Sequence, residues 1–269
     1  MSSAAGLTRS DGAGAALCEQ RAVVSPLPVL LAAGLGSRLG GRAKALFPLK
    51  GRALLDHCIE TLNAAGFERV LIVTGHASDA LEAHAAASRY PILIECVHNA
   101  RYRDLNNFYT LRVACAAVRG PMLVLNSDII FTLEVLDAVL DGEGDLRLAI
   151  EAGPVDAEAL KVHALDGVVR ALGKELDSRT AFGEFVGISL MSESARRQYV
   201  KAADEALARG QGTLYYEDVY DSLCDTVQVR AVEVSPGSWA EIDTPSDITD
   251  AAVVAGRKVD GDDRCDVRS

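Results

Sequence analysis

The sequence predicts an α/β fold, with a Rossmann-like, mixed and mostly parallel sheet flanked by helices. Of the 269 residues, 49% are apolar, which is enough for a sizeable core. In the first half, short apolar runs alternate with helical patterns, as is typical of parallel strands joined by crossover helices. We expect strands at 29–33, 70–74, 92–97 and 122–125, and helices at 53–66, 79–88 and 107–118.

The second half predicts shorter connections and a smaller inserted subdomain, at about 150–235, that covers the substrate. Its pattern predicts strands at 146–151, 160–164, 168–172, 185–190 and 227–234, and helices at 193–208 and 214–223. The whole is expected to form a single domain over 26–256. The segments outside it, 1–25 and 257–269, are expected to be disordered tails because of their composition.

Charge and composition narrow the classes of partner. The formal net charge of −11 disfavours a nucleic acid, because phosphate backbones are bound mainly by Lys and Arg. No apolar run approaches the ~18–20 residues that span a bilayer, so membrane insertion is not expected. None of the six cysteines forms a C-x-x-C pair, and a reducing, cytoplasmic location is the simplest expectation.

A glycine-rich loop, LAAGLGSRLGGRAKAL, follows the first expected strand. Gly34 and Gly36 let backbone N–H groups approach a phosphate closely, and Arg38 and Lys44 can neutralise a triphosphate. A dinucleotide motif is disfavoured because Leu39 stands where G-x-G-x-x-G needs its third glycine, and the P-loop motif is absent. The plain alternative is a glycine-rich turn that binds nothing.

The loop resembles the signature loop of the nucleotidyltransferases that activate sugars and alcohol phosphates, written loosely G-x-G-x-R followed by Pro-Lys. Ala43 stands where that signature has its proline. The resemblance implies a glycosyltransferase-A-like fold and catalytic roles for Arg38 and Lys44. It also implies that the nucleotide is bound by Leu31, Ala32, Ala33, Gly34, Gly36 and Ser37.

Carboxylates follow two apolar runs that are far apart in the chain. Asp128 comes after the strand expected at 122–125, and Glu241 and Asp243 precede a helix expected to begin near Pro245. Oxygen ligands of this kind suit Mg²⁺, which usually bridges carboxylates to substrate phosphates. The resemblance implies that Asp128 and Asp243 share the metal. The plain alternative is that each caps a helix.

The segment NARYRDLNNFYTL resembles part of the bacterial-type phosphocholine cytidylyltransferases and of related enzymes that activate 2-aminoethylphosphonate. The resemblance implies that Asn106, Asn107 and Thr110 bind the nucleotide. An Asn-rich helix cap is the alternative.

An acceptor site is expected around YYEDVYDSL, because a cationic head group suits aromatic faces and nearby carboxylates. The residues concerned are Tyr215, Tyr216, Glu217, Asp218 and, from a distant segment, Trp239. Ordinary packing is the alternative for Tyr216 and Trp239.

The segment RALGKELDSRTAFGEFVGIS resembles related cytidylyltransferases, including those for inositol 1-phosphate. The resemblance implies that Lys174 meets the acceptor's phosphate and that Glu184 meets a cation or a hydroxyl. A hairpin with solvated charges is the alternative.

The resemblance spans roughly 28–255 and implies transfer of CMP from CTP, with Mg²⁺, to a small amino-alcohol phosphate or aminophosphonate. Phosphocholine and 2-aminoethylphosphonate are the leading acceptors, and pyrophosphate is the expected leaving product. One alternative is the same chemistry, as a cytidylyl- or uridylyltransferase, on a polyol or sugar phosphate such as inositol 1-phosphate. An alternative of another class is a nucleotide-binding regulatory protein without turnover.

Overall fold

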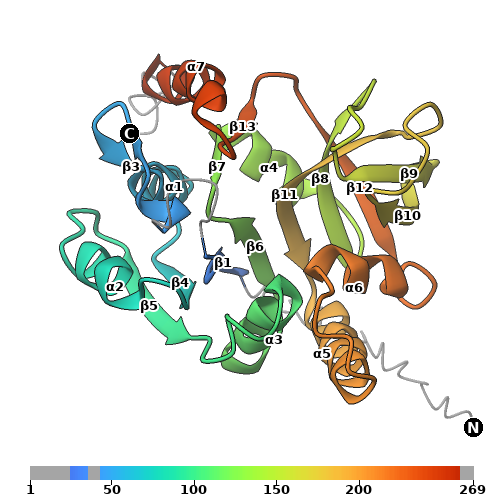
Figure 1. Ribbon diagram of the computed structural model, residues 1–269. Coiled ribbons are helices and arrows are strands. Elements are labelled where there is room, and N and C mark those ends of the chain that lie inside the picture. Colours follow the sequence, from blue (N-terminus) through green and yellow to red (C-terminus); the bar gives the residue numbers. More distant parts are fainter. Residues whose placement is uncertain (1–24, 36–42, 261–269) are drawn as a thin grey trace, which may run out of the picture.

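The computed structural model describes residues 25–35 and 43–260, and within them a nine-stranded mixed sheet forms the centre of the molecule (Figure 1). Four neighbouring strands are parallel. In spatial order they are β5 (Leu93–His98), β4 (Arg69–Thr74), β1 (Leu27–Ala32) and β6 (Met122–Asn126). Their carboxyl ends therefore meet at one edge, where the ligands of such sheets bind.

The second half of the chain extends this sheet beyond β6. The added strands are, in spatial order, β11 (Gly183–Met191), β8 (Leu146–Ala152), β12 (Val229–Val234), β10 (Val168–Gly173) and β9 (Lys161–Leu165). β12 pairs parallel with β8, whereas β11 runs antiparallel to both β6 and β8. The prediction of a mixed sheet flanked by helices is confirmed, and its parallel pairs are those among β5, β4, β1 and β6 and that of β12 with β8.

Helices cover both faces of the sheet because strand side chains alternate between them. One core receives α3 (Asn107–Ala117), α5 (Glu193–Ala208) and α6 (Tyr216–Leu223). The opposite core receives α1 (Leu54–Ala64), α2 (Ser78–Ala86) and α4 (Leu133–Asp141). In β1, Val29 and Leu31 enter the first core, whereas Leu30 and Ala32 enter the second.

A separate two-stranded sheet pairs a strand from the middle of the chain with one from near its end. β7 (Ile129–Phe131) pairs antiparallel with β13 (Trp239–Glu241), and η3 (Pro245–Asp247) and α7 (Ile248–Asp260) follow. Ile130 and Ile242 pack there against Ala251 and Val254 of α7. The local pattern of the sequence did not predict this pair, and it determines where the carboxylates of the site meet.

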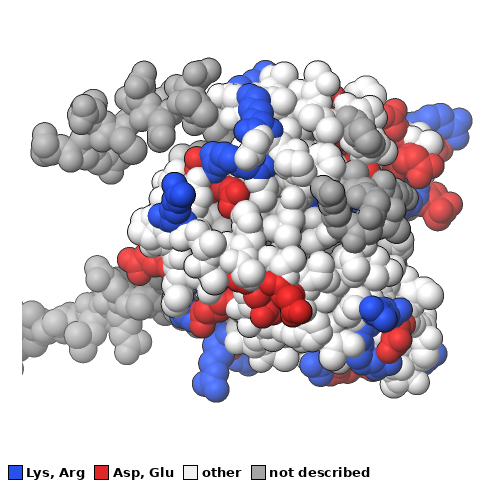
Figure 2. Space-filling model, turned by 60° about the vertical axis from the view of Figure 1, so that its left-hand side comes forward, with Lys and Arg blue, Asp and Glu red and all other residues white. Residues whose placement is uncertain are grey.

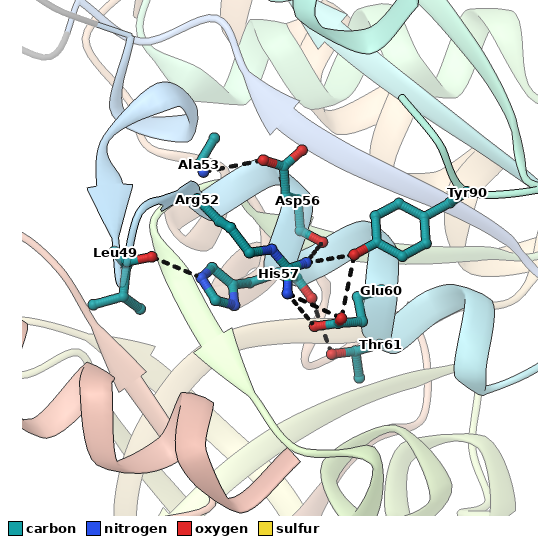
Figure 3. A network of polar contacts seen from close by, with 8 residues as sticks. All are labelled: Leu49, Arg52, Ala53, Asp56, His57, Glu60, Thr61 and Tyr90. Carbon is teal, nitrogen blue, oxygen red and sulfur yellow. Dashed lines mark hydrogen bonds and ion pairs between the residues drawn. The ribbon is translucent and has the colours of Figure 1, made fainter. Parts of the chain in front are cut away.

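A network of polar contacts fastens the segment after the glycine-rich loop (Figure 3). This segment runs through η2 (Lys44–Leu46) and a hairpin of β2 (Pro48–Leu49) and β3 (Arg52–Ala53). Arg52 donates to Glu60 of α1 at 3.0 Å and also contacts the Tyr90 hydroxyl. Because Arg52 and Glu60 are each 37% exposed, their pair contributes about 0.2–1 kcal/mol.

The described surface carries charges of both signs. Figure 2 shows Lys and Arg in separate groups, with Asp and Glu between them and uncharged surface around. Among the described helices, none combines the length and the apolar character that crossing a membrane requires.

Candidate active site

Three carboxylates meet at the edge of the sheet where β6 ends. Single oxygens of Asp128, Glu241 and Asp243 all lie within 4.8 Å of one another. The β7–β13 pair creates this arrangement: Glu241 lies opposite Ile129, and the Ile242 N–H donates to the Asp128 carbonyl at 2.9 Å. The structure thus brings the two predicted metal ligands together and adds Glu241 as a third.

The donor set fits a hard divalent cation. Asp128 Oδ1 is shut off from solvent and has no hydrogen-bond partner among the described residues. Glu241 reaches solvent, yet the cluster raises its pKa above the ordinary value, first by loss of hydration and then by the like charges of Asp128 and Asp243. A divalent ion would satisfy the buried oxygen and offset the repulsion, and Mg²⁺ prefers such oxygen ligands.

Lys44 is the cation that faces this cluster. Its Nζ donates to Asp128 Oδ2 at 2.8 Å and also to Asp243. Burial alone would lower the pKa of Lys44, but the two carboxylates outweigh burial and hold the pKa above its ordinary value. Lys44 therefore remains charged at neutral pH and can pair with phosphate oxygens.

A pocket of about 350 Å³ opens beside the end of β1. Ala33 and Gly34 line one side, and the segments 102–107 and 212–213 line the others. Leu31 and Ala32 lie within β1 with their side chains in the two cores, and both are paired with β4, so their predicted role in nucleotide binding stays a prediction. The predicted residues Gly36, Ser37 and Arg38 lie outside the described residues.

Asn106, Asn107 and Thr110 line this pocket and also hold α3 in place through hydrogen bonds within the protein, and their predicted role in nucleotide binding stays a prediction. Asn106 caps α3, accepting from the Asn107 N–H at 2.8 Å and donating to the Thr213 carbonyl at 3.0 Å. Asn107 Oδ1 accepts from the Tyr216 N–H at 2.9 Å. The buried Thr110 hydroxyl accepts from Asn99 at 3.1 Å. These three side chains line the pocket, but their oxygens connect α3 to its neighbours.

Tyr216 does not offer an aromatic face to a ligand, which corrects another prediction. It is 0% exposed, and its ring packs edge-on against Tyr220 at 5.2 Å and Phe185 at 6.4 Å between centroids. Its hydroxyl donates to Asn126 Oδ1 at 3.0 Å. The plain alternative, ordinary packing, is correct for this residue.

The neighbours of Tyr216 in the YYED segment differ among themselves. Tyr215 is 53% exposed. Asp218 is exposed at the start of α6, and its Oδ2 accepts from the Tyr215 N–H at 2.7 Å, while its predicted role toward a cation stays a prediction. Glu217 is half-buried, and its Oε2 is closed to solvent and has no hydrogen-bond partner among the described residues. Burial raises the pKa of Glu217 to about 7, and the charges of Asp218 and Asp128 add to the rise.

Gly187 makes room for the end of β6. It lies in an irregular stretch of β11, between Phe185 and Ser189, with a φ of 79°. A Cβ at Gly187 would lie 2.6 Å from Asn126 Nδ2. Glycine is therefore required both by its left-handed backbone and by the close approach of Asn126.

Glu184 lies directly opposite Glu151 where β11 pairs with β8. Burial raises the pKa of Glu184, and the like charges of Glu151 and Asp156 raise it further. Trp239 donates from Nε1 to Glu151 Oε2 at 2.6 Å, so this predicted residue joins the same group. The charge of Glu184 in turn raises the pKa of Glu241, which links this group to the metal-ligand cluster.

Lysines flank Glu184 on its other side. Lys174 is exposed, and its charge acts on Glu184 in the direction that lowers the pKa. Lys161, which the sequence analysis did not single out, is buried and donates to the carbonyls of Ala157, Ala159 and Lys174. Lys161 is thus a structural cation that is satisfied by backbone oxygens.

Comparison with known proteins shows what the chain is similar to. Residues 28–156 match the family described as the MobA-like NTP transferase domain. A CMP-5'-(3-aminopropyl)phosphonate synthase from Streptomyces rubellomurinus is 30% identical over 81% of this chain and 37% of that protein. A CTP:phosphoglutamine cytidylyltransferase from Campylobacter jejuni is 25% identical over 82% of this chain and 96% of that protein.

Several of the relatives are much longer than this chain. It spans 37%, 49% and 50% of three of the curated proteins that it matches, the synthase among them. What those longer proteins do as wholes therefore does not carry over directly.

Solved structures show the same fold. The inositol-1-phosphate CTP transferase from T. maritima superposes with a TM-score of 0.71 at 20% identity, covering 87% of this chain and 96% of that one. The CTP:phosphocholine cytidylyltransferase from Streptococcus pneumoniae gives 0.68 at 21% identity, covering 85% and 98%. The predicted fold is confirmed. Residues 28–156 are thus similar to a MobA-like NTP transferase domain, and the chain shares the fold of these solved structures.

Proposed function

We propose that the protein transfers CMP from CTP to a small phosphate or phosphonate acceptor that carries a cationic amino group. The observation that carries the proposal is the cluster of Asp128, Glu241 and Asp243 with Lys44. Two carboxylates from the second half of the chain interact electrostatically with this cluster. The charge of Glu184 raises the pKa of Glu241, and the charge of Asp128 raises the pKa of Glu217.

The reaction is an in-line substitution at the α-phosphorus of CTP. An acceptor oxygen forms a bond to the α-phosphorus as the bond to the oxygen that bridges to the β-phosphorus breaks, and pyrophosphate leaves. The attacking phosphate or phosphonate oxygen is already anionic. No general base is therefore needed, and no proton is transferred in this step.

The residues act by binding and charge neutralisation. The backbone at Ala33 and Gly34 borders the pocket proposed for the nucleotide, and Lys44 donates to the triphosphate oxygens. Arg38, outside the described residues, is proposed as a second cation. Asp128, Glu241 and Asp243 would hold Mg²⁺, which when bound supplies charge stabilisation to the phosphates.

Cytosine is proposed as the base because several relatives have names that include CMP or CTP. The acidic residues Glu151, Glu184 and Glu217 favour a cationic acceptor over a neutral polyol, because negative charge attracts a positive group and not a neutral one. We propose that the phosphate of the acceptor lies toward the metal cluster. The exposed Lys174 is a further cation, and its charge acts on Glu184.

A panel assay tests the proposal. Pyrophosphate release is measured for each of the four ribonucleoside triphosphates with Mg²⁺ and phosphocholine, phosphoethanolamine, 2-aminoethylphosphonate, inositol 1-phosphate or glucose 1-phosphate. We expect release with CTP and amino-bearing acceptors. Release only with a polyol or sugar phosphate would contradict the acceptor class. CTP binding by calorimetry without release in any mixture would support a regulatory protein instead.

A further inference from the structure

Lys44 bridges two of the carboxylates that are proposed to hold the metal. Its Nζ donates to Asp128 Oδ2 at 2.8 Å and also to Asp243 Oδ1. A divalent ion bound to either carboxylate would lie beside the ammonium, and two cations so close repel each other. All three side chains are partly buried, so water screens that repulsion only in part. Lys44 and a divalent ion therefore compete for the same two carboxylates.

The two carboxylates are held in place by backbone hydrogen bonds beside them. The Asp128 carbonyl accepts from the Ile242 N–H at 2.9 Å. Asp247 Oδ2 accepts from the Asp243 N–H at 2.9 Å and from the Thr244 N–H at 2.7 Å. These bonds fix the backbone from which both carboxylates project. The competition is therefore relieved most easily by a movement of the lysine.

Lys44 can move its ammonium without a change in the backbone. It begins η2 between the buried residues Ala43 and Ala45, and its carbonyl accepts from the Phe47 N–H at 2.8 Å. Its side chain, in contrast, is a flexible stem of four carbons with three donors on one ammonium. The ammonium can therefore turn from the carboxylates to the oxygens of a phosphate while the chain around it stays in place.

We propose that Lys44 couples the binding of the metal to the binding of the nucleotide. While it pairs with Asp128 and Asp243, the ammonium weakens the binding of a divalent ion that arrives alone. A triphosphate draws the ammonium to its own oxygens and leaves both carboxylates to the ion. This inference rests on the metal and the nucleotide of the proposed function, and it adds that the two bind together, each strengthening the other.

One substitution with opposite effects on two ligands tests the inference. Mn²⁺ is titrated into the protein alone, and its binding is followed by EPR of free Mn²⁺ and by the fluorescence of Trp239, the only tryptophan. We expect Lys44→Gln to bind Mn²⁺ at least about tenfold more tightly than the parent, because a competing charge is removed. We expect its affinity for the Mn²⁺–CTP complex, measured by calorimetry without an acceptor, to fall at least about tenfold, because Lys44 then pairs with phosphate.

Two further variants separate the charge of the lysine from its shape and from general effects. Lys44→Arg keeps the positive charge and should bind Mn²⁺ within about threefold of the parent. Lys201→Gln, which removes the charge of an exposed lysine on α5, is the matched control and should change both affinities by no more than about twofold. Thermal unfolding checks that each variant is folded, and Mn²⁺ at one concentration should raise the Tm of Lys44→Gln more than that of the parent.

The direction of the two effects decides the outcome. Tighter binding of both Mn²⁺ and Mn²⁺–CTP by Lys44→Gln would overturn the inference, because Lys44 would then oppose the metal even beside a phosphate. Weaker or unchanged binding of Mn²⁺ alone would overturn it too, because no competition would then exist. Neither result bears on CMP transfer, which the acceptor panel measures. Opposite effects without pyrophosphate release in that panel would overturn the proposed function and support the coupling.

Discussion

The parallel half of the sheet and its mixed half are built on different principles. In the parallel half, β5, β4, β1 and β6 alternate with helices along the chain, so their carboxyl ends converge through local connections. In the mixed half, apart from the adjacent strands β9 and β10, neighbouring strands come from distant segments, and β11 and β8 meet through long-range register. The match to the NTP transferase domain covers 28–156, which includes the parallel half and ends just after β8.

The two halves also bring different chemistry to the site. The parallel half contributes backbone at Ala33 and Gly34 and the cation Lys44, which suit a phosphate. The mixed half contributes Glu151, Glu184 and Glu217, which suit a cation. Under the proposed function, the parallel half would bind the nucleotide and the mixed half would bind the acceptor. The relatives agree with this division, since their names share a nucleotide and differ in the acceptor.

Asp128 lies where the two halves meet, and its loss should have the largest effect. Asp128→Asn removes a charge from the proposed metal site while keeping the shape of the side chain. We expect kcat to fall by about 10³-fold, because a metal contributes several kcal/mol of charge stabilisation. CTP binding measured by calorimetry without metal should change little. Asp204→Asn, which breaks the exposed pair with Arg112, should stay within about twofold of the parent rate, and a similar loss there would contradict the assignment.

The adjacent residues Tyr215 and Tyr216 should differ in how much each contributes to the free energy of unfolding. Tyr216→Ala removes a fully buried ring and its bond to Asn126, and should lower the free energy of unfolding by about 3–5 kcal/mol. Tyr215→Ala changes an exposed side chain and should cost about 0.5 kcal/mol or less. Denaturant unfolding of the two variants compares them. Equal losses would mean that both rings belong to one surface site.

The carboxylate of Glu217, in the mixed half, predicts that a neutral substitution stabilises the fold in a pH-dependent way. The pKa of Glu217 is raised from 4.5 to about 7 on folding, so the unfolded state loses its proton first as pH rises. Stability should therefore fall between about pH 5 and 8 in the parent, and Glu217→Gln should remove that part of the fall. Relative to the parent, the free energy of unfolding of Glu217→Gln should be higher by on the order of 3 kcal/mol at pH 8, and this difference should vanish near pH 4. Unfolding curves with urea at several pH values measure it. A constant difference at all pH values would contradict it.

Alanine substitutions at Gly187 and Gly210 distinguish the cost of backbone strain from the cost of a side-chain clash. Gly187 and Gly210 both have a left-handed φ, but only at Gly187 would a Cβ meet another side chain, that of Asn126. Both alanine variants should lose about 1 kcal/mol from backbone strain, and Gly187→Ala should lose about 2 kcal/mol more. Thermal unfolding compares them. Equal losses would show that Asn126 moves aside freely.

Local patterns were sufficient for the parallel half because each strand and its helix are adjacent in the chain. The helix expected at 107–118 is α3 at Asn107–Ala117, and the strand expected at 70–74 is β4 at Arg69–Thr74. The fold class followed from this alternation. Lys44 and the carboxylates Asp128 and Asp243 were identified together only because the signature loop was recognised.

Long-range register explains most of what the sequence did not predict. The strands β7 and β13 have three residues each, too few to show a pattern, and their pairing makes Glu241 the third carboxylate of the cluster. Tyr216 was misinterpreted although a signal was available. With Tyr220 and Leu223 it continues a helical stripe at the spacing of a buried face, and that stripe is in the core.

The central claim is that nucleotidyl transfer joins CMP to an amino-bearing acceptor. ³¹P NMR of the protein with CTP, Mg²⁺ and 2-aminoethylphosphonate follows both products at once. The account predicts loss of the free phosphonate signal, growth of two coupled resonances from a new phosphonate–phosphate linkage, and one pyrophosphate for each linkage formed. Conversion of CTP to CMP and pyrophosphate with the phosphonate signal unchanged, or coupling only with inositol 1-phosphate in its place, would contradict it.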